Sequence, residues 1–306
     1  MNMIPITTAD DPQIEAFRGL RDRTLRGEEI FIAEGTLLVE RLLRSRFTTD
    51  ALLVIPELLA HIESIIASLP ADSGGDPAAP GTFPVYVAPN ALLREIAGFP
   101  FHRGAMAIGC RRPDPTFDEL LHRTGALLTI NTDSSALSRQ RWIIVPEVTK
   151  PENLGHVFRS AAAFGLNGVL LGPRCGDPLS RRSLRVSMGG TLFQPYARSR
   201  LINHAPAPQG GSADALLTDL RRLRSEFGFE LWAAVLAPDA VPLDHLTSPA
   251  TTLPNRLGIL IGNEFDGLDA STIATCDRKV TIPMAPDTDS LNLGVATGIF
   301  CYATSR

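Results

Sequence analysis

The sequence predicts an α/β protein of two domains, with the larger domain at the C-terminus. Its 306 residues are enough for two ordinary domains, each with its own core. Hydrophobic residues make up 44% of the chain and charged residues 20%, which excludes wholesale disorder and collagen-like or coiled-coil classes. Short apolar segments alternate with amphipathic ones, a pattern that is typical of strands alternating with helices.

Residues 1–112 predict a small α/β domain. Short aliphatic runs predict strands at 31–35, 51–55, 84–87 and 104–110. Amphipathic segments between them predict helices at 36–45, 57–69 and 91–97. The two prolines of the segment 111–116 mark a linker, so residues 113–141 are either linker or the start of the second domain.

Residues 142–306 predict a larger domain built on a parallel sheet. Its expected strands are longer and more apolar than those of the first domain and lie at 142–148, 168–172, 230–237, 257–263 and 279–284. Nearly continuous apolar strands alternating with helices are typical of a parallel sheet that helices cover on both faces. Ligands bind such sheets at the carboxyl ends of the strands, so the loops that follow these strands are the first candidates for a site.

Several common sites are excluded by inspection. Neither lysine follows a glycine, so a Walker A loop is absent, and no G-x-G-x-x-G follows a strand. Ser187 lies in R-V-S-M-G, which lacks the first glycine of a nucleophile elbow. The histidines form no H-x-x-x-H pair, so we expect no metal site.

The four cysteines stand far apart and predict reduced thiols in a cytoplasmic protein: Cys110, Cys175, Cys276 and Cys301. The first residues, MNMIPITTADD, contain no basic region before an apolar core, so we expect no secretory signal. No apolar run approaches the roughly 18 residues that a membrane helix needs, and no membrane partner is expected.

The net charge of −4 argues weakly against a nucleic-acid partner, but the arginines are unevenly distributed. Between residues 174 and 200, several arginines stand against the single acidic residue Asp177. Attraction for phosphate is set locally, because salt screens charges over about 10 Å. Solvated helix faces remain the alternative interpretation. The candidate phosphate contacts are Arg18, Arg21, Arg23, Arg26, Arg181, Arg182 and Arg185.

The segment 151–165 follows the first strand of the second domain and predicts a helix from Leu154, with Asn153 as its N-cap. Its apolar face is expected to contain Leu154, Val157, Phe158 and Ala161. The opposite face groups the polar side chains of Asn153, His156, Arg159 and Ser160. Taken alone, this pattern favours a capped surface helix with a solvated Arg159.

The segment 257–268 is a predicted strand that runs into a loop bounded by Gly262 and Gly267. These glycines permit a tight turn and a close approach of the backbone to a ligand. Glu264 lies inside the loop, where its carboxylate could accept hydrogen bonds or pair with an arginine. An ordinary turn between strand and helix is the alternative.

The segment 282–303 predicts a terminal helix with Ser290 as its N-cap. Its inward face is expected to contain Leu291, Val295, Ile299 and Tyr302. Asp287 and Asp289 lack the spacing of a calcium-binding loop and are interpreted as loop and helix-start residues.

Three of these segments together resemble the SpoU/TrmH branch of the SPOUT methyltransferases, a family of RNA 2'-O-methyltransferases. They are ENLGHVFRSAAAFG, IGNEFDGL and IPMAPDTDSLNLGVATGI, in the order and approximate spacing of that family. The resemblance covers residues 142–306 well. It extends more loosely to RTLRGEEIFIAEGTLLVERLL, which looks like the start of an L30e-like RNA-binding domain.

The resemblance implies a fold, an assembly and a cofactor. The family threads its C-terminus through a trefoil knot, which is a rare exception among folds, and acts as a homodimer. S-adenosylmethionine would lie in the knot, held largely by the backbone near Gly262, Asn263, Gly267, Ile282, Met284 and Leu291. The implied catalytic residues are Asn153, Arg159, Glu264, Ser290 and Asn292, with Arg159 approaching the cofactor of the other subunit.

Arg159 has two possible roles under this resemblance. The family's proposed general base is this arginine, but a neutral guanidinium near pH 7 would cost roughly 8 kcal/mol. Arg159 could instead orient the ribose hydroxyl or the adjacent phosphate, with Glu264 and Asn153 fixing the guanidinium. Methyl transfer to a 2'-hydroxyl needs in-line placement and help with the proton, but no metal.

Two residues depart from the family pattern. Phe265 stands where glycine is common, which could reshape the cofactor or substrate pocket. Gly294 stands where serine is usual and is expected to loosen the terminal helix by about 0.5–1 kcal/mol. Neither departure removes a residue assigned to catalysis.

The sequence therefore predicts an S-adenosylmethionine-dependent 2'-O-methyltransferase that acts on structured RNA. The N-terminal domain favours ribosomal over transfer RNA, by analogy with the family. Transfer RNA methylation and a non-catalytic RNA-binding homologue are the alternatives.

Overall fold

The computed structural model describes residues 2–18, 29–69, 83–98, 104–127, 138–200, 212–248, 250–286 and 290–305. The chain forms two compact units. Unit 1 contains Met1–Pro113 and Asp177–Phe193, and unit 2 contains Asp114–Gly176 and Gln194–Arg306. The segment Asp177–Phe193 thus packs with the N-terminal residues although it interrupts unit 2 in sequence. No motif in the sequence indicates that this segment belongs to unit 1.

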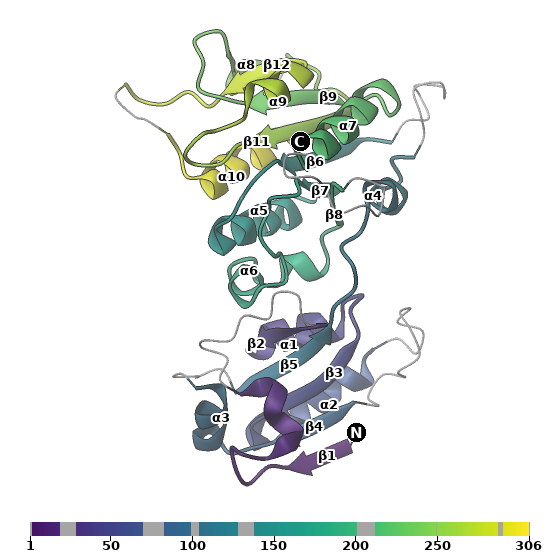
Figure 1. Ribbon diagram of the computed structural model, residues 1–306, viewed down its shortest axis with the longest axis vertical. Coiled ribbons are helices and arrows are strands. Elements are labelled where there is room, and N and C mark those ends of the chain that lie inside the picture. Colours follow the sequence, from purple (N-terminus) through teal and green to yellow (C-terminus); the bar gives the residue numbers. More distant parts are fainter. Residues whose placement is uncertain are drawn as a thin grey trace. The chain divides into compact units, whose positions relative to one another are not determined.

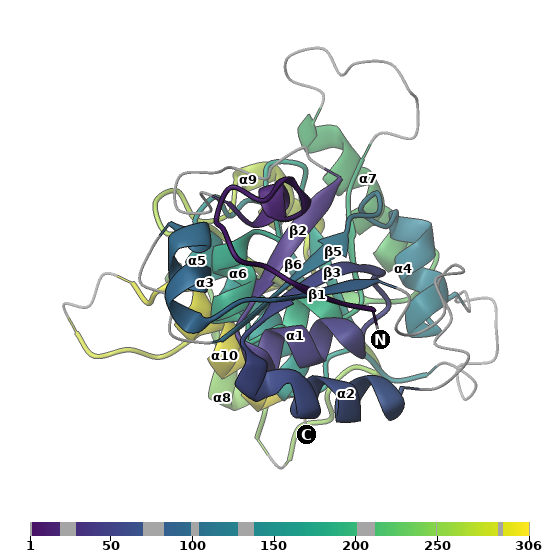
Figure 2. The same ribbon diagram turned by 90° about the horizontal axis from the view of Figure 1, so that it is seen from below.

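Unit 1 is built on a five-stranded mixed sheet (Figure 2). The strand order is β1 (Asn2–Pro5), β4 (Pro84–Val87), β3 (Thr49–Val54), β5 (Ala105–Cys110) and β2 (Ile30–Glu34). The first three of these strands are parallel, whereas β5 runs antiparallel to both of its neighbours. The predicted strands of the first domain are therefore present, and β1 is an addition that its exposed, irregular pattern did not predict.

Helices cover both faces of the unit 1 sheet. One face packs against α1 (Thr36–Leu43), η2 (Pro56–Leu58) and α2 (Leu59–Ala67), and the other against η1 (Pro12–Phe17) and α3 (Asn90–Ala97). The inserted segment contributes α6 (Arg181–Val186) and η4 (Gly190–Leu192), whose Leu184 and Leu192 are buried in the same core as α1. An ion pair of 2.7 Å between Arg111 and Asp177 ties the start of this segment to unit 1.

Unit 2 is built on a seven-stranded sheet in which every pairing is parallel, as the sequence predicts. The strand order is β10 (Val241–Pro242), β12 (Arg278–Thr281), β9 (Glu230–Ala234), β11 (Arg256–Ile261), β6 (Gln140–Val145), β7 (Gly168–Leu171) and β8 (Tyr196–Arg198). The short edge strands β8 and β10 were not predicted, because two or three residues carry no periodicity.

The unit 2 sheet lies between two layers of helices (Figure 1). One layer contains α5 (Pro151–Ala163), α8 (Leu243–Leu246) and α10 (Leu293–Thr304), and the other contains α4 (Phe117–Thr124), α7 (Ser212–Ser225) and α9 (Ala270–Thr275). Side chains alternate between the layers along each strand: in β6, Ile143 faces α5 whereas Trp142 faces α4. The sheet is therefore buried on both faces.

Two helix starts differ from the sequence prediction. Helix α5 begins at Pro151 after Lys150, so Asn153 is not an N-cap but lies buried in the first turn. Proline at the first helical position supports this earlier start, because its missing N–H has no partner to lose there. Helix α10 begins at Leu293, and its N-cap is Asn292, whose side chain accepts from the Gly294 N–H, rather than Ser290.

The inward face of α10 was predicted only in part: Ile299 packs against the core as expected, but the other predicted helix residues do not. The buried residues are Leu293, Gly294, Thr297, Phe300, Cys301 and Thr304, whereas Val295 and Tyr302 are each 51% exposed. Helix α10 is apolar around most of its circumference, so a helical spacing of apolar residues could be drawn on either side. The buried face of α5, in contrast, contains the four predicted residues.

Candidate active site

Three polar side chains meet where β6, β11 and the segment before α10 come together. The Asn292 side-chain N–H group donates to Asn153 Oδ1 at 3.0 Å and to Glu264 Oε1 at 2.5 Å. Asn153 lies in the first turn of α5 and Glu264 in the loop after β11. We call Asn153, Glu264 and Asn292 the polar trio. The sequence analysis assigned all three to the site, and the fold brings them together.

Lys150 supplies a positive charge beside the polar trio. Its Nζ donates to Glu264 Oε2 at 2.7 Å. This hydrogen bond, with further ones from Asn153 and Asn292, holds the pKa of the Glu264 carboxyl below its usual range, so the group is ionised near neutral pH. Glu264 thus accepts hydrogen bonds, which was one of its two expected roles, and its ion pair is with Lys150 rather than with an arginine. Lys150 was missed in the sequence, although it directly precedes the proline that starts α5.

The loop between Gly262 and Gly267 is tightly closed, and we call it the glycine loop. A Cβ atom on Gly262 would lie 2.3 Å from the Gly267 carbonyl carbon, so only glycine fits there. Asn263 pairs with Gly267, and its Oδ1 accepts from the Phe265 N–H at 2.9 Å and the Asp266 N–H at 2.8 Å. Gly267 adopts a φ of 67°, in the left-handed region that favours glycine. The backbone is therefore fixed at this position.

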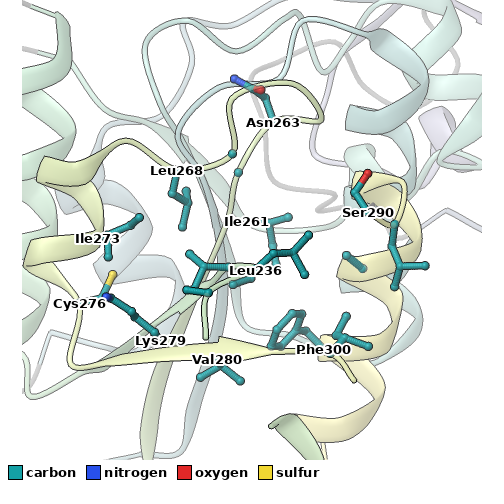
Figure 3. Close-up of a pocket in the computed structure, with 18 of the residues that line it drawn as sticks. Leu236, Ile261, Asn263, Leu268, Ile273, Cys276, Lys279, Val280, Ser290 and Phe300 are labelled. Carbon is teal, nitrogen blue, oxygen red and sulfur yellow. The ribbon is translucent and has the colours of Figure 1, made fainter. Parts of the chain in front are cut away.

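The glycine loop forms one wall of a pocket of about 1240 Å³. Figure 3 shows apolar side chains from several elements turned into it, among them Leu236, Ile261 and Phe300, with Asn263 and Ser290 at its edge. Every residue that the sequence analysis assigned to the cofactor lines this pocket: Gly262, Asn263, Gly267, Ile282, Met284 and Leu291. Glu264 and Ser290 line it too, so the pocket adjoins the polar trio.

The rest of the pocket wall was not singled out in the sequence. It comes from residues 234–237 after β9, from α9 and from β12, including Lys279, which forms a 2.7 Å ion pair with Asp239. These residues carry no distinctive motif. Only their place in the fold could have indicated them, because β9 ends at the same edge of the parallel sheet as β11.

The polar trio and the pocket lie within the part of the chain that matches a known protein family. A model of the SpoU rRNA Methylase family matches residues 140–302, which include all of the residues described above. The chain belongs to the SpoU rRNA methylase family. This membership confirms the resemblance drawn from the three motifs and identifies the chain as an RNA methyltransferase of that family.

Individual SpoU relatives extend the match to the whole chain. An uncharacterized tRNA/rRNA methyltransferase of Mycobacterium tuberculosis is 34% identical over 303 residues, which cover 97% of this chain and 90% of that protein. The 23S rRNA (guanosine-2'-O-)-methyltransferase RlmB of Acinetobacter baylyi is 28% identical over 222 residues, which cover 72% and 78% of the two chains. An AdoMet-bound rRNA methyltransferase of Sinorhizobium meliloti shares the fold, with a TM-score of 0.69 at 21% identity over 98% of this chain and 97% of that one.

Arg159 stands apart from the polar trio in this SpoU chain. It is exposed on α5 and forms no hydrogen bond or ion pair with any residue that the structure describes. The expected contacts of its guanidinium with Glu264 and Asn153 are therefore absent within the described chain. The physical reason is helix geometry: Arg159 lies six residues after Asn153 on α5, so the exposed Arg159 and the buried Asn153 are on different sides of the helix.

The arginines expected to contact RNA differ in their surroundings. Arg18 donates to the Asp11 carbonyl at 2.6 Å, and Arg181 is paired with the buried Glu34, so both take part in internal contacts of unit 1. Arg182 and Arg185 are exposed on α6. The remaining candidates, Arg21, Arg23 and Arg26, lie outside the described residues.

Two features are absent from the described part of the chain. No group of three or more histidine, cysteine, aspartate or glutamate side chains there is arranged to hold a metal ion. No helix there combines the length and apolar character needed to cross a bilayer. The four cysteines are free.

Proposed function

We propose that this SpoU family member is an S-adenosylmethionine-dependent RNA 2'-O-ribose methyltransferase that acts on ribosomal RNA. The observation that carries the proposal is the glycine-loop pocket directly beside the polar trio. The relative RlmB, named as a 23S rRNA 2'-O-methyltransferase, supports the choice of reaction and of ribosomal RNA. Transfer RNA remains the alternative substrate, since the Mycobacterium relative is named for both RNAs.

The pocket fits S-adenosylmethionine in size and character. Apolar side chains such as Leu236 and Ile261 suit an adenine ring, and the closed glycine loop presents the backbone of Gly262 to the pocket. The glycine loop and the segment with Ile282, Met284 and Leu291 would hold the cofactor. When bound, it supplies a methyl group on a positively charged sulfonium. The AdoMet-bound Sinorhizobium structure supports this assignment.

The polar side chains would position the RNA ribose at the pocket mouth. Glu264 is ionised and tied to Lys150 and Asn292, so its carboxylate fixes the glycine loop and adds negative charge there. Ser290 and the polar trio can offer hydrogen bonds to ribose hydroxyls. Arg159 would orient the 2'-hydroxyl or the adjacent phosphate as a cation, since a neutral guanidinium is costly near pH 7.

We further propose that the protein is a homodimer in which Arg159 serves the pocket of the partner subunit. Arg159 has no partner among the described residues, and the outer surface of α5 and α10 is unusually apolar. Val295 and Tyr302 are each 51% exposed on α10, and Phe164, which follows α5, packs edge-on against Tyr302. Burial of such a surface between two copies is favourable.

Two proposals concern the fold around the site. We propose that the segment before α10 is threaded as the family's trefoil knot, because Ile282 and Leu291 line the same pocket as the glycine loop. We propose that unit 1 is an L30e-like domain that docks the RNA. The exposed Arg182 and Arg185 on α6 support this role, since local positive charge attracts phosphate.

Transfer of a labelled methyl group tests the proposed function. The protein is incubated with tritiated S-adenosylmethionine and with total RNA from cells that lack it, and the RNA is separated by size. Label in ribosomal RNA, located at a ribose by mass spectrometry, is the expected result. Label confined to transfer RNA would overturn the choice of substrate. Absence of label together with absence of cofactor binding in calorimetry would favour the non-catalytic homologue.

A further inference from the structure

Phe265 is the most exposed large apolar side chain among the described residues, at 83%. It lies in the glycine loop, between Glu264 and Asp266, and is one of the residues that line the pocket. Single exposed apolar residues are common and by themselves need no explanation. Phe265 differs because its backbone is held by Asn263 Oδ1 in the closed glycine loop, so the ring is anchored beside the polar trio.

One side of the Phe265 ring is already engaged. Lys150 Nζ lies 5.0 Å from the ring centroid, within cation–π range, while it also donates to Glu264. Lys150 is the residue before the first turn of α5, and it contacts both Glu264 and Phe265 in the glycine loop. Most of the ring surface is therefore open to solvent, and the one side that is contacted faces Lys150.

The charges around the ring indicate what could stack on it. Glu264 and Asp266 flank Phe265, and Lys150 is the one cation that the described structure places against this ring, so the local balance is not positive. A phosphate would be repelled by the two carboxylates. The flat face of a nucleobase carries no net charge and stacks readily on an aromatic side chain.

We propose that Phe265 is a stacking platform for a base of the substrate RNA, adjacent to the ribose that is held at the polar trio. The proposal rests on the proposed function, because the pocket mouth faces RNA only in an RNA-modifying enzyme. Phe265 is a positioning residue: it holds the RNA so that the ribose reaches the pocket, and it makes no contact with the reacting atoms.

Tryptophan fluorescence tests the platform without measuring methyl transfer. Both native tryptophans, Trp142 and Trp232, are buried, so Phe265→Trp introduces a fluorophore that iodide can reach. A twelve-residue oligoadenylate RNA should quench the emission of the introduced indole and protect it from iodide, whereas an abasic ribose-phosphate chain of the same length should not. Leu127→Trp, at an exposed position that follows α4, is the matched control and should respond to neither.

Kinetics of methyl transfer provide the second test. Phe265→Ala and Phe265→Leu should raise the KM for RNA about tenfold with kcat nearly unchanged, and Phe265→Tyr should restore the wild-type KM. Cofactor affinity, measured by calorimetry, should stay within twofold. A fall in cofactor affinity that accounts for the whole loss would make Phe265 a cofactor contact and overturn the proposal.

The outcomes separate the platform from the proposed function. Quenching of the Phe265→Trp variant by oligoadenylate, with no methyl transfer by the wild-type protein, would keep the platform as an RNA contact and reject the methyltransferase. Normal methyl transfer by Phe265→Ala, with no quenching of the Phe265→Trp variant, would reject the platform and keep the methyltransferase. Iodide protection of the introduced indole that rises with protein concentration in the absence of RNA would show that a second copy covers this position, and would also overturn the proposal.

Discussion

Lys150 shows how one side chain can set the state of a site. It fixes the charge of Glu264 and contacts the Phe265 ring, so it links the start of α5 to the glycine loop. Lysine and carboxylate form a charge-assisted hydrogen bond, which is among the stronger polar contacts in proteins. Half of the Lys150 side chain is nevertheless exposed, so solvent screens the pair, and its role is to position rather than to stabilise the fold.

Lys150→Met should shift the pH dependence of methyl transfer. Without the ammonium group, the pKa of the Glu264 carboxyl should rise, because its largest stabilising contact is lost. Activity should then fall at a higher pH than in the wild type as the solution is made more acidic. Profiles of kcat/KM between pH 4 and 8 measure this shift.

The other lysine provides the control for this experiment. Lys279 pairs with Asp239 and not with Glu264, so Lys279→Met should leave the position of the acid limb unchanged. An unshifted limb in Lys150→Met would show that Glu264 protonation does not govern activity.

Asp219 is a buried carboxyl remote from the proposed chemistry. It lies on α7, and its Oδ2 has no hydrogen-bond partner among the described residues. Burial raises its pKa to about 6, opposed in part by the Ser199 hydroxyl and Arg222. An acid whose pKa is higher in the folded state destabilises the fold once it ionises, so stability decreases as pH rises from about 4 to about 6.

Asp219→Asn should therefore stabilise the protein at neutral pH. The gain in the free energy of unfolding should approach ~3 kcal/mol above pH 6 and shrink towards zero near pH 4. Urea unfolding at pH 4.5 and 7.5 measures it. Asp10→Asn, at a side chain that is 94% exposed, is the control and should show no such gain. Equal stability of Asp219→Asn and wild type at pH 7.5 would contradict the assignment.

At the scale of elements, the contact of α10 with α5 determines the geometry of the site. Both helices carry members of the polar trio at or near their first turns, Asn153 in α5 and Asn292 as the cap of α10. The far end of α10 is held by the buried Arg141, whose Nε donates to the Thr304 carbonyl at 2.9 Å. Gly294 lies at the closest approach of the two helices, where a Cβ atom would be 2.5 Å from His156 Cβ.

Gly294 thus has a packing role that the sequence interpretation did not anticipate. The sequence suggested a loosened helix, whereas the structure shows a position where a side chain would push α10 from α5. Gly294→Ala should destabilise the protein by about 1–3 kcal/mol through overpacking and should weaken cofactor binding. Thermal unfolding and calorimetry measure the two effects.

Gly298→Ala is the matched control on the same helix. The nearest atom to its Cβ would be Ser160 Oγ at 3.6 Å, an ordinary contact. Alanine there should stabilise α10 by about 0.5–1 kcal/mol through helix propensity. Equal effects of the two substitutions would show that His156 does not limit the approach of α10.

The elements show how far sequence reasoning reaches in this chain. The parallel sheet was predictable because its strands are continuous apolar runs, and the polar trio because its residues lie in the three motifs that resemble the SpoU/TrmH family. The orientation of α10 was not, since Val295 and Tyr302 are as apolar as the residues that are buried. The pairing of Glu264 with Lys150 was not, because it joins residues 114 apart that share no pattern.

At the scale of the whole molecule, the dimer proposal makes a quantitative prediction. Arg159→Ala should lose methyl transfer, and Gly262→Ala should lose cofactor binding, because its Cβ would collide with the Gly267 carbonyl carbon. If Arg159 acts on the partner's pocket, a mixed dimer of these two variants contains one complete site. Random exchange of subunits should then restore about a quarter of wild-type activity.

Separate and mixed samples of the two variants measure this directly, with subunit exchange followed by mass photometry or native mass spectrometry. No recovery in a confirmed mixed dimer would show that Arg159 serves the pocket of its own subunit. A protein that stays monomeric at assay concentration would reject the dimer itself.

The composition of the two units has a consequence for how this protein can be divided. Because Asp177–Phe193 packs in unit 1, the chain passes between the units three times, after residues 113, 176 and 193. Removing residues 1–113 would leave Leu179, Leu184 and Leu192 without the neighbours that bury them. No single cut of the chain therefore separates the two units. A truncation at one boundary would expose apolar side chains of the segment Asp177–Phe193 and favour aggregation.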